Sequence, residues 1–195
     1  MGVAQISFWV VVAVLVFWSV GAYNRLVRLR AAIKQAFTAT ESHIRQRDAL
    51  LAQWAEASRA QASRAQATGE SHAADAVLAA CAQVLAASDH ARAWPSGARA
   101  IAGLRLAEEV LGDARARLNT ELAAMAPLVP MSPMSLTRPV IAPTPQAEAL
   151  AAVDASLGFA RHQYNDAAQT YNDAVAQFPT WVIAGVFGFR AAGAL

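Results

Sequence analysis

Cysteine and histidine are the residues of this chain that could bind a metal ion or attack a substrate. The chain has one cysteine, Cys81, and four histidines, which are His43, His72, His90 and His162. A lone cysteine can form neither an internal disulfide nor a Cys-cluster zinc site. Its apolar neighbours at helical spacing predict a buried and inert thiol. His162 and Asp166 are four residues apart, but helices produce this pairing often, so we interpret the histidines as surface residues.

Other motifs that would indicate catalysis are missing from the sequence. It has no phosphate-binding glycine loop, nucleophile elbow, HExxH motif or zinc-spaced pair. Asp166 and Asp173 lie seven residues apart, which places them on one solvated helix face rather than in a pocket that would shift their pKa values. We therefore predict no catalytic residue, metal ion or cofactor, no small-molecule substrate, and no enzymatic activity.

The overall composition fits one helical domain together with a membrane anchor. The chain has 195 residues and a net charge of +2, and so mild a charge argues against a nucleic-acid partner. Hydrophobic residues make up 56% of it, but many of these are alanines, which favour helix and bury little area. Strand patterns are weak throughout, so the predicted fold class is all-α.

The first 22 residues predict a transmembrane anchor. No charged residue occurs from Gly2 to Asn24, and an apolar helix of about 20 residues can span a bilayer. Trp9 and Trp18 lie toward the two ends, where indole rings favour the headgroup zone. The alternative is a cleaved signal peptide, since residues 20–22 resemble a cleavage site. However, residues 1–7 carry no Lys or Arg, which a signal peptide needs, and Ile6 rules out a myristoylation signal.

A cluster of basic residues directly follows the anchor and predicts its orientation. The cluster consists of Arg25, Arg28, Arg30 and Lys34. Positive charge resists translocation, so we expect a single-pass membrane protein with the N-terminus outside and residues 23–195 in the cytoplasm. The cluster is also expected to attract anionic lipid headgroups, which makes membrane lipid a predicted partner.

Apolar residues three or four positions apart predict four helices after the anchor. The expected ranges are about 23–67, 71–93, 97–126 and 146–178. No proline or glycine occurs from Ala22 to Thr68, so we expect the anchor to continue directly into the first of these helices. Between the last two, residues 127–145 hold six of the eight prolines and predict an extended loop that lies on the bundle. The apolar tail, residues 180–195, is too short and glycine-rich for a second span, so it should pack on the bundle or against the membrane surface.

The last helix predicts an aromatic packing face. Tyr164 and Tyr171 are seven residues apart and share this face with Phe178, while Asn165 and Asn172 lie one position further round. Tyrosine buries a large ring and needs a partner for its hydroxyl group. We interpret the face as core packing, with the asparagines bonding to a neighbouring helix. A ligand-binding aromatic stripe is the functional alternative.

Charged residues interrupt two of the predicted apolar faces. Arg47 lies between Ile44 and Leu51, and Asp154 and Arg161 lie seven apart in the last helix. A charge at a core position is costly unless it is paired. We therefore predict that Arg47 meets a carboxylate from another helix, first Asp154 and next Glu108 or Glu109. The alternative is that these long side chains extend to the rim of the bundle.

Two segments resemble the LemA family of bacterial membrane proteins. The first segment consists of two stretches. YNRLVRLRAAIKQAF begins at Tyr23 and Asn24, and IRQRDALL begins at Ile44 and includes Arg47. The other is ARHQYNDAAQTYNDAVAQFPTWVIAGVFGF, from Ala160 to Phe189, with its two Tyr-Asn pairs, Phe178-Pro179 and closing Gly-Phe. The chain departs from the family pattern at Ala52, where a proline is usual, and at Thr40-Glu41, where Ile-Asp is usual. The proline-rich loop has no family counterpart that we can match.

The resemblance implies a transmembrane helix followed by a long antiparallel four-helix bundle, and no enzymatic activity. We therefore expect a membrane-anchored scaffold that binds a protein partner or self-associates. The alternative is an accessory or regulatory subunit of a membrane protease or transporter.

Overall fold

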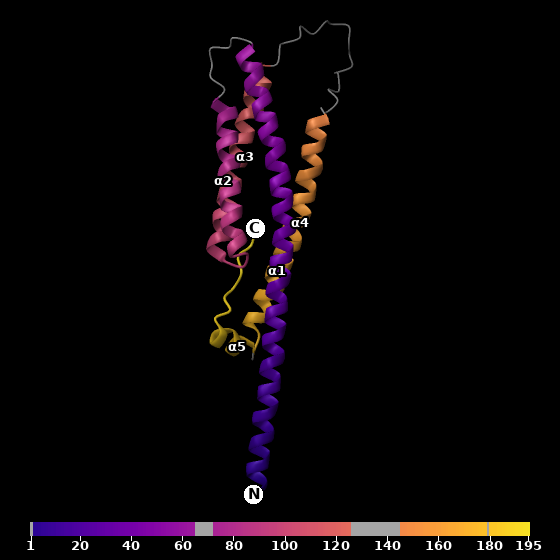
Figure 1. The fold of residues 1–195 in the computed structure, drawn as a ribbon, viewed down its shortest axis with the longest axis vertical. Coiled ribbons are helices and arrows are strands. Elements are labelled where there is room, and N and C mark those ends of the chain that lie inside the picture. Colours follow the sequence, from indigo (N-terminus) through magenta and orange to yellow (C-terminus); the bar gives the residue numbers. More distant parts are fainter. Residues whose placement is uncertain (1, 65–71, 126–144, 179) are drawn as a thin grey trace.

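The described part of the chain folds into five helices, of which the first is by far the longest (Figure 1). The structure, a computed structural model, describes residues 2–64, 72–125, 145–178 and 180–195. The helices are α1 (Val3–Arg64), α2 (His72–Ala93), α3 (Ala98–Met125), α4 (Pro145–Ala176) and α5 (Thr180–Phe187). No strand occurs in these ranges, and the predicted all-α class is confirmed.

Helix α1 is one uninterrupted helix of 62 residues, so the expected continuity between anchor and bundle is observed. Gly21 produces no break, because no bulky or polar group competes for the helical hydrogen bonds there. At 1.5 Å per residue, the helix is about 93 Å long. Its N-terminal third extends well beyond every other helix, as Figure 1 shows in indigo.

The bundle consists of α1, α2, α3 and α4, with α1 as the central element. Helix α4 packs along one side of α1 and α2 along another, while α3 packs on α2. Helices α3 and α4 do not pack closely along their lengths. A single core cluster joins all four helices, and its fully buried large side chains include Phe37, Ile44, Val77, Leu104 and Tyr164.

Local sequence signals explain where the helices begin and end. A tight turn joins α2 to α3, where the Gly97 amide donates to the carbonyl of Trp94 at 2.8 Å. A Cβ atom at Gly97 would lie 3.1 Å from that carbonyl oxygen, so glycine fits this turn better than any larger residue. Helix α4 begins at Pro145, where the missing amide hydrogen of proline costs nothing.

The apolar tail forms the short helix α5 and then turns back onto the bundle. Gly188 has a positive φ of 70°, which reverses the chain direction at the end of α5. Residues 189–195, which we name the C-terminal strap, then run without helical structure along the bundle. The tail was expected to pack either on the bundle or against the membrane surface. The strap, which is the last part of the tail, packs on the bundle.

Some expectations from the sequence fall outside the described residues. They are the proline-rich loop predicted for residues 127–145, apart from Pro145, and Pro179 of the Phe178-Pro179 motif.

Candidate functional site: paired charges and a clamped C-terminus

A layer of four charged side chains lies inside the bundle. It consists of Arg47 and Asp48 on α1, Glu108 on α3 and Arg161 on α4, and we name it the central charge layer. Each residue stands where the apolar stripe of its helix would otherwise continue: Arg47 follows Ile44, Glu108 follows Leu104, and Arg161 precedes Tyr164. The helical spacing places each charge on the buried face of its helix, and the packing of the helices brings the charges to one level of the bundle.

Glu108 is the centre of the layer, because it binds both arginines. Arg47 Nη2 lies 3.2 Å from one Glu108 oxygen, and Arg161 pairs with the other oxygen. Arg47 also forms two hydrogen bonds with Asp48, at 2.8 and 3.0 Å. Two arginines and two carboxylates balance in charge, which reduces the cost of burying them.

The first predicted partner of Arg47 is wrong, and the second is correct. Asp154 lies toward the edge of the bundle, where it pairs with Arg115 of α3 at 2.7 Å. It is seven residues from Arg161 along α4, about 10 Å, and so lies at a different level from Arg47. Glu108 is the observed partner from another helix. The alternative that Arg47 extends to the rim is also wrong, because its side chain is only 9% exposed.

Burial in and beside the central charge layer shifts the pKa values of Asp48, Arg161 and the neighbouring thiol of Cys81. Burial raises the pKa of Asp48, although the Arg47 guanidinium opposes that shift, and Asp48 Oδ2 has no hydrogen-bond partner among the described residues. Burial, followed by the charge of Asp48, raises the pKa of Cys81 to about 11. Burial and the nearby Arg47 lower the pKa of Arg161. A thiol with so high a pKa is a poor nucleophile at neutral pH, which agrees with the predicted inert Cys81.

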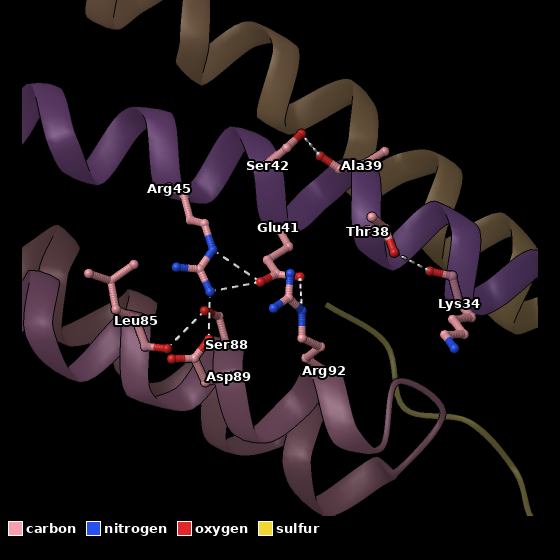
Figure 2. A network of polar contacts seen from close by, with 10 residues as sticks. All are labelled: Lys34, Thr38, Ala39, Glu41, Ser42, Arg45, Leu85, Ser88, Asp89 and Arg92. Atoms are coloured by element: carbon pink, nitrogen blue, oxygen red, sulfur yellow. Dashed lines mark hydrogen bonds and ion pairs between the residues drawn. The ribbon is translucent and has the colours of Figure 1, made fainter.

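A second buried carboxylate, Glu41, lies seven residues before Asp48 on α1. Its side chain is only 3% exposed and binds two arginines, Arg45 at 2.9 Å and Arg92 at 3.1 Å. Figure 2 shows how Arg92 reaches Glu41 from α2, while Arg45 also contacts Asp89. These pairs connect α1 to α2, as the central charge layer connects α1 to α3 and α4. Neighbouring Thr40 is also buried, and its hydroxyl lies 3.2 Å from the Ala160 carbonyl of α4.

Sequence reasoning missed Glu41 and Asp48 as buried groups. The signal was present, because Thr40 and Arg47 are seven residues apart, and so are Glu41 and Asp48. That is the spacing of the apolar core positions Phe37, Ile44 and Leu51. The repeat predicts one face for all of these residues.

The aromatic face of α4 packs in the core and fixes the C-terminal strap. Tyr164 is fully buried, packs edge-on against Phe37 with ring centroids 6.0 Å apart, and donates to the carbonyl of Pro95 or Gly193. Burial raises its pKa and that of Tyr171. The predicted core role of Tyr164 and Tyr171 therefore fits their burial.

The expected role of the two asparagines differs from the observed one. Asn172 exchanges two hydrogen bonds with the backbone of Ala192, at 2.7 and 3.0 Å. Asn165 does the same with Leu195, at 2.8 and 2.9 Å. They therefore bind the strap as a neighbouring strand would, rather than a neighbouring helix, because the strap lies against this side of α4. Phe178 does not belong to the packing face, since α4 ends at Ala176 and its ring is 81% exposed.

The remaining motif residues lie where α1 leaves the anchor. Tyr23 contacts two aromatic rings of the tail, with centroids 5.0 Å from Phe187 and 5.9 Å from Phe189. Arg25 lies 3.5 Å from Gln177 at the end of α4, and Asn24 is exposed. Arg28, Arg30 and Lys34 are exposed as well. The first-helix motif thus joins the C-terminal motif, although the two lie at opposite ends of the sequence.

The histidines do not gather into a metal site in the described part of the chain. No group of three or more His, Cys, Asp or Glu residues there could hold a metal ion. His162 lies 3.6 Å from Asp166 on the exposed face of α4, as the four-residue spacing suggested. The charges of the bundle are instead arranged to bind one helix to another.

Comparison with known proteins supports the resemblance over the C-terminal region. No curated protein and no solved structure matches the chain. The sequence profile of the LemA family matches residues 146–195, which comprise nearly all of α4, together with α5 and the C-terminal strap. This is the region in which Tyr164, Asn165 and Asn172 hold the strap. The resemblance to the LemA family is therefore confirmed over residues 146–195.

Proposed function

We propose that this protein is a non-enzymatic scaffold of the bacterial inner membrane. Its anchor crosses the bilayer once with the N-terminus outside, and the bundle extends into the cytoplasm to bind a protein partner or a second copy. The match to the LemA family and the apolar N-terminal helix are consistent with a membrane-anchored protein.

The observation that carries this proposal is the change in exposure along one continuous helix. In residues 6–20 of α1 nearly every large apolar side chain is exposed, including Phe17 at 80%. Helix α1 is the one described helix that is long and apolar enough to cross a membrane. Because α1 does not break at Gly21, any movement of the anchor is passed rigidly to the bundle. Arg25, Arg28, Arg30 and Lys34 support the cytoplasmic position of the bundle.

Exposed apolar side chains on the bundle offer surfaces for a partner. Leu106 on α3 is 62% exposed, and Phe159 on α4 is 65% exposed. Neither residue belongs to the core cluster. Contiguous patches of such side chains mark interaction sites, so we propose these two positions as points at which a partner is tested.

Photo-crosslinking in native membranes tests the proposal. A photoreactive amino acid would replace Leu106 or Phe159 in the full chain, with the exposed polar residue Gln169 of α4 as a matched control. We expect one recurrent adduct from the apolar positions, either with a second copy or with one membrane-associated protein. A recurrent protease or transporter would assign the accessory role instead of a scaffold. Equal and diffuse labelling from all three positions would contradict both roles.

A further inference from the structure

Two adjoining cavities lie at the end of the bundle nearest the anchor. The larger has a volume of about 540 Å³ and lies between α1, the turn joining α2 to α3, α4 and the chain after α5. The smaller, of about 390 Å³, lies between α1, the same turn and the strap. Both are lined by Arg30 and Ser96, so they adjoin, and we name the two together the basal cavity.

The walls of the basal cavity are strongly basic. Five cationic side chains line it, namely Arg30, Lys34, Arg92, Arg99 and Arg190, and none of its lining residues is Asp or Glu. Arg92 is engaged by Glu41 at 3.1 Å. The other four make no ion pair within the described part of the chain. They come from α1, α3 and the strap, so the fold brings these positive charges together from distant parts of the sequence.

The charges of the basal cavity differ from those of the central charge layer. Within that layer, each arginine faces a carboxylate. Around the cavity, four basic side chains gather without such partners, and a concentration of one sign of charge in a cleft attracts an anion. Arginine binds phosphate oxygens with two parallel hydrogen bonds, so several arginines around one space favour a phosphate group.

The basal cavity also lies at the height expected for lipid headgroups. Its lower wall includes Tyr23 and Val27, which directly follow the anchor. Arg30 is seven residues beyond Tyr23, a rise of about 10 Å along α1. Helix α5 lies beside Tyr23 and exposes Trp181, Val186 and Phe187. Aromatic and apolar side chains of this kind favour the membrane interface.

We propose that the basal cavity binds the phosphate-bearing headgroup of one anionic phospholipid. Arg30, Arg99 and Arg190 hold the phosphate group, while the exposed face of α5 rests among the acyl chains beside the anchor. Basic pockets between helices at the cytoplasmic side of membrane proteins bind headgroups in this way. This inference rests on the membrane attachment in the proposed function, but on neither of the partner roles considered there.

Lipid retention by the full chain tests the site. The purified protein in detergent would receive equal amounts of phosphatidylglycerol and phosphatidylcholine, and native mass spectrometry would count the lipids retained. The test variant is Arg99→Gln with Arg190→Gln. The matched control is Arg105→Gln with Arg117→Gln, which removes the same charge from exposed positions of α3 outside the cavity. A parallel arm adds inorganic phosphate, which separates a lipid headgroup from a free anion.

We expect one phosphatidylglycerol to be retained in preference to phosphatidylcholine. The test variant should weaken retention about 30-fold, because each basic side chain near a lipid surface contributes a factor of about five. The control should retain lipid as the parent does. Equal retention of the two lipids, an equal loss in test and control, or full displacement by inorganic phosphate would overturn the proposal.

Loss of the lipid site and failure of the proposed function are distinguishable. All four substituted arginines are exposed, so the variants should unfold at the temperature of the parent protein. Both should also remain in the membrane fraction, because the anchor is unchanged. A parent protein absent from the membrane fraction would contradict the proposed function itself.

Discussion

The two halves of α1 belong to one helix, yet their side chains face opposite kinds of surroundings. From Ile6 to Val20 the large apolar side chains are almost all exposed, and the segment carries no charge. From Leu26 to Ser58 a buried stripe repeats every three or four residues, and it includes Glu41, Arg47 and Asp48.

The difference shows which surroundings stabilise each part of the helix. Exposed apolar side chains on all sides are stable only where the surroundings are themselves apolar, as in a bilayer. Buried charges are stable only where neighbouring helices supply opposite charges. The N-terminal half therefore depends on lipid, and the C-terminal half depends on α2, α3 and α4. The predictions below separate these two dependences.

The largest expected effect comes from removing the carboxylate shared by two arginines. Glu108→Ala should lower the free energy of unfolding by about 3–5 kcal/mol, because it leaves Arg161 without its carboxylate partner and deprives Arg47 of one of its two. Urea unfolding of the full chain in detergent, followed by circular dichroism, measures this loss.

The matched control for Glu108 is Asp154→Ala. Asp154 and Arg115 are each about one third exposed, so their pair should contribute less than about 1 kcal/mol. A double-mutant cycle should couple Arg47 to Glu108, while Arg47→Ala and Asp154→Ala should add independently. Equal losses for Glu108→Ala and Asp154→Ala would argue against the central charge layer.

A charge placed in the anchor should weaken membrane insertion. Val14→Arg should cost about 2.5–3.5 kcal/mol of insertion free energy, since arginine is strongly disfavoured at the centre of a bilayer. The same substitution at Ala32, an exposed position in the bundle half of α1, should have little effect. The fraction of protein resistant to carbonate extraction measures the difference. If both variants stayed bound like the parent, the N-terminal half would not be the membrane-spanning segment.

A methyl group placed in the C-terminal strap should displace it from the bundle. A Cβ atom at Gly193 would lie 2.9 Å from the Ala98 Cα of α3, where backbone cannot easily move. Gly193→Ala should cost about 1–3 kcal/mol and increase amide exchange at Ala192 and Leu195, whose amides donate to Asn172 and Asn165.

Gly185→Ala is the matched control for the strap. A Cβ atom at Gly185 meets nothing within 4 Å, so this variant should leave amide exchange at the strap unchanged. Hydrogen exchange with mass spectrometry compares the two variants. Parent-like protection of the strap in Gly193→Ala would show that it does not pack between α3 and α4.

A further expected effect, confined to alkaline pH, is a pH dependence that arises from the buried thiol. The pKa of Cys81 is about 11 in the folded state, above its ordinary value of 9.0. The folded protein therefore keeps a proton that the unfolded chain releases between these values. The stabilisation is complete below pH 9 and is lost as the pH rises toward 11, by up to about 1.4 kcal/mol per pH unit.

Comparison with Cys81→Ala isolates the contribution of the thiol. The raised pKa values of Tyr164 and Tyr171 act in the same direction above pH 10, so some alkaline loss should remain in this variant. Denaturant unfolding at several pH values from 8 to 11 gives the slope. An identical slope in parent and variant would show that the thiol does not titrate as described.

The sequence predicted the elements of this fold better than it predicted their contacts. Three- and four-residue spacing predicted helices where α1 to α4 lie but not α5, and the burial of Tyr164 followed from it. It could not distinguish Asp154 from Glu108 as the partner of Arg47, because helix order in space and axial level are properties of the packed bundle. The strap was also unpredictable in detail, since Asn165 and Asn172 bind backbone atoms, which carry no sequence signal.

Cysteine labelling in spheroplasts tests most directly whether α1 holds the bundle on the inner side of the membrane. In a Cys81→Ala background, one variant would carry Gly2→Cys, before the anchor, and another would carry Ala102→Cys, exposed on α3. A membrane-impermeant maleimide added to intact spheroplasts should label position 2 at once and position 102 only after the membrane is opened. Immediate labelling at position 102 in intact spheroplasts would contradict the account.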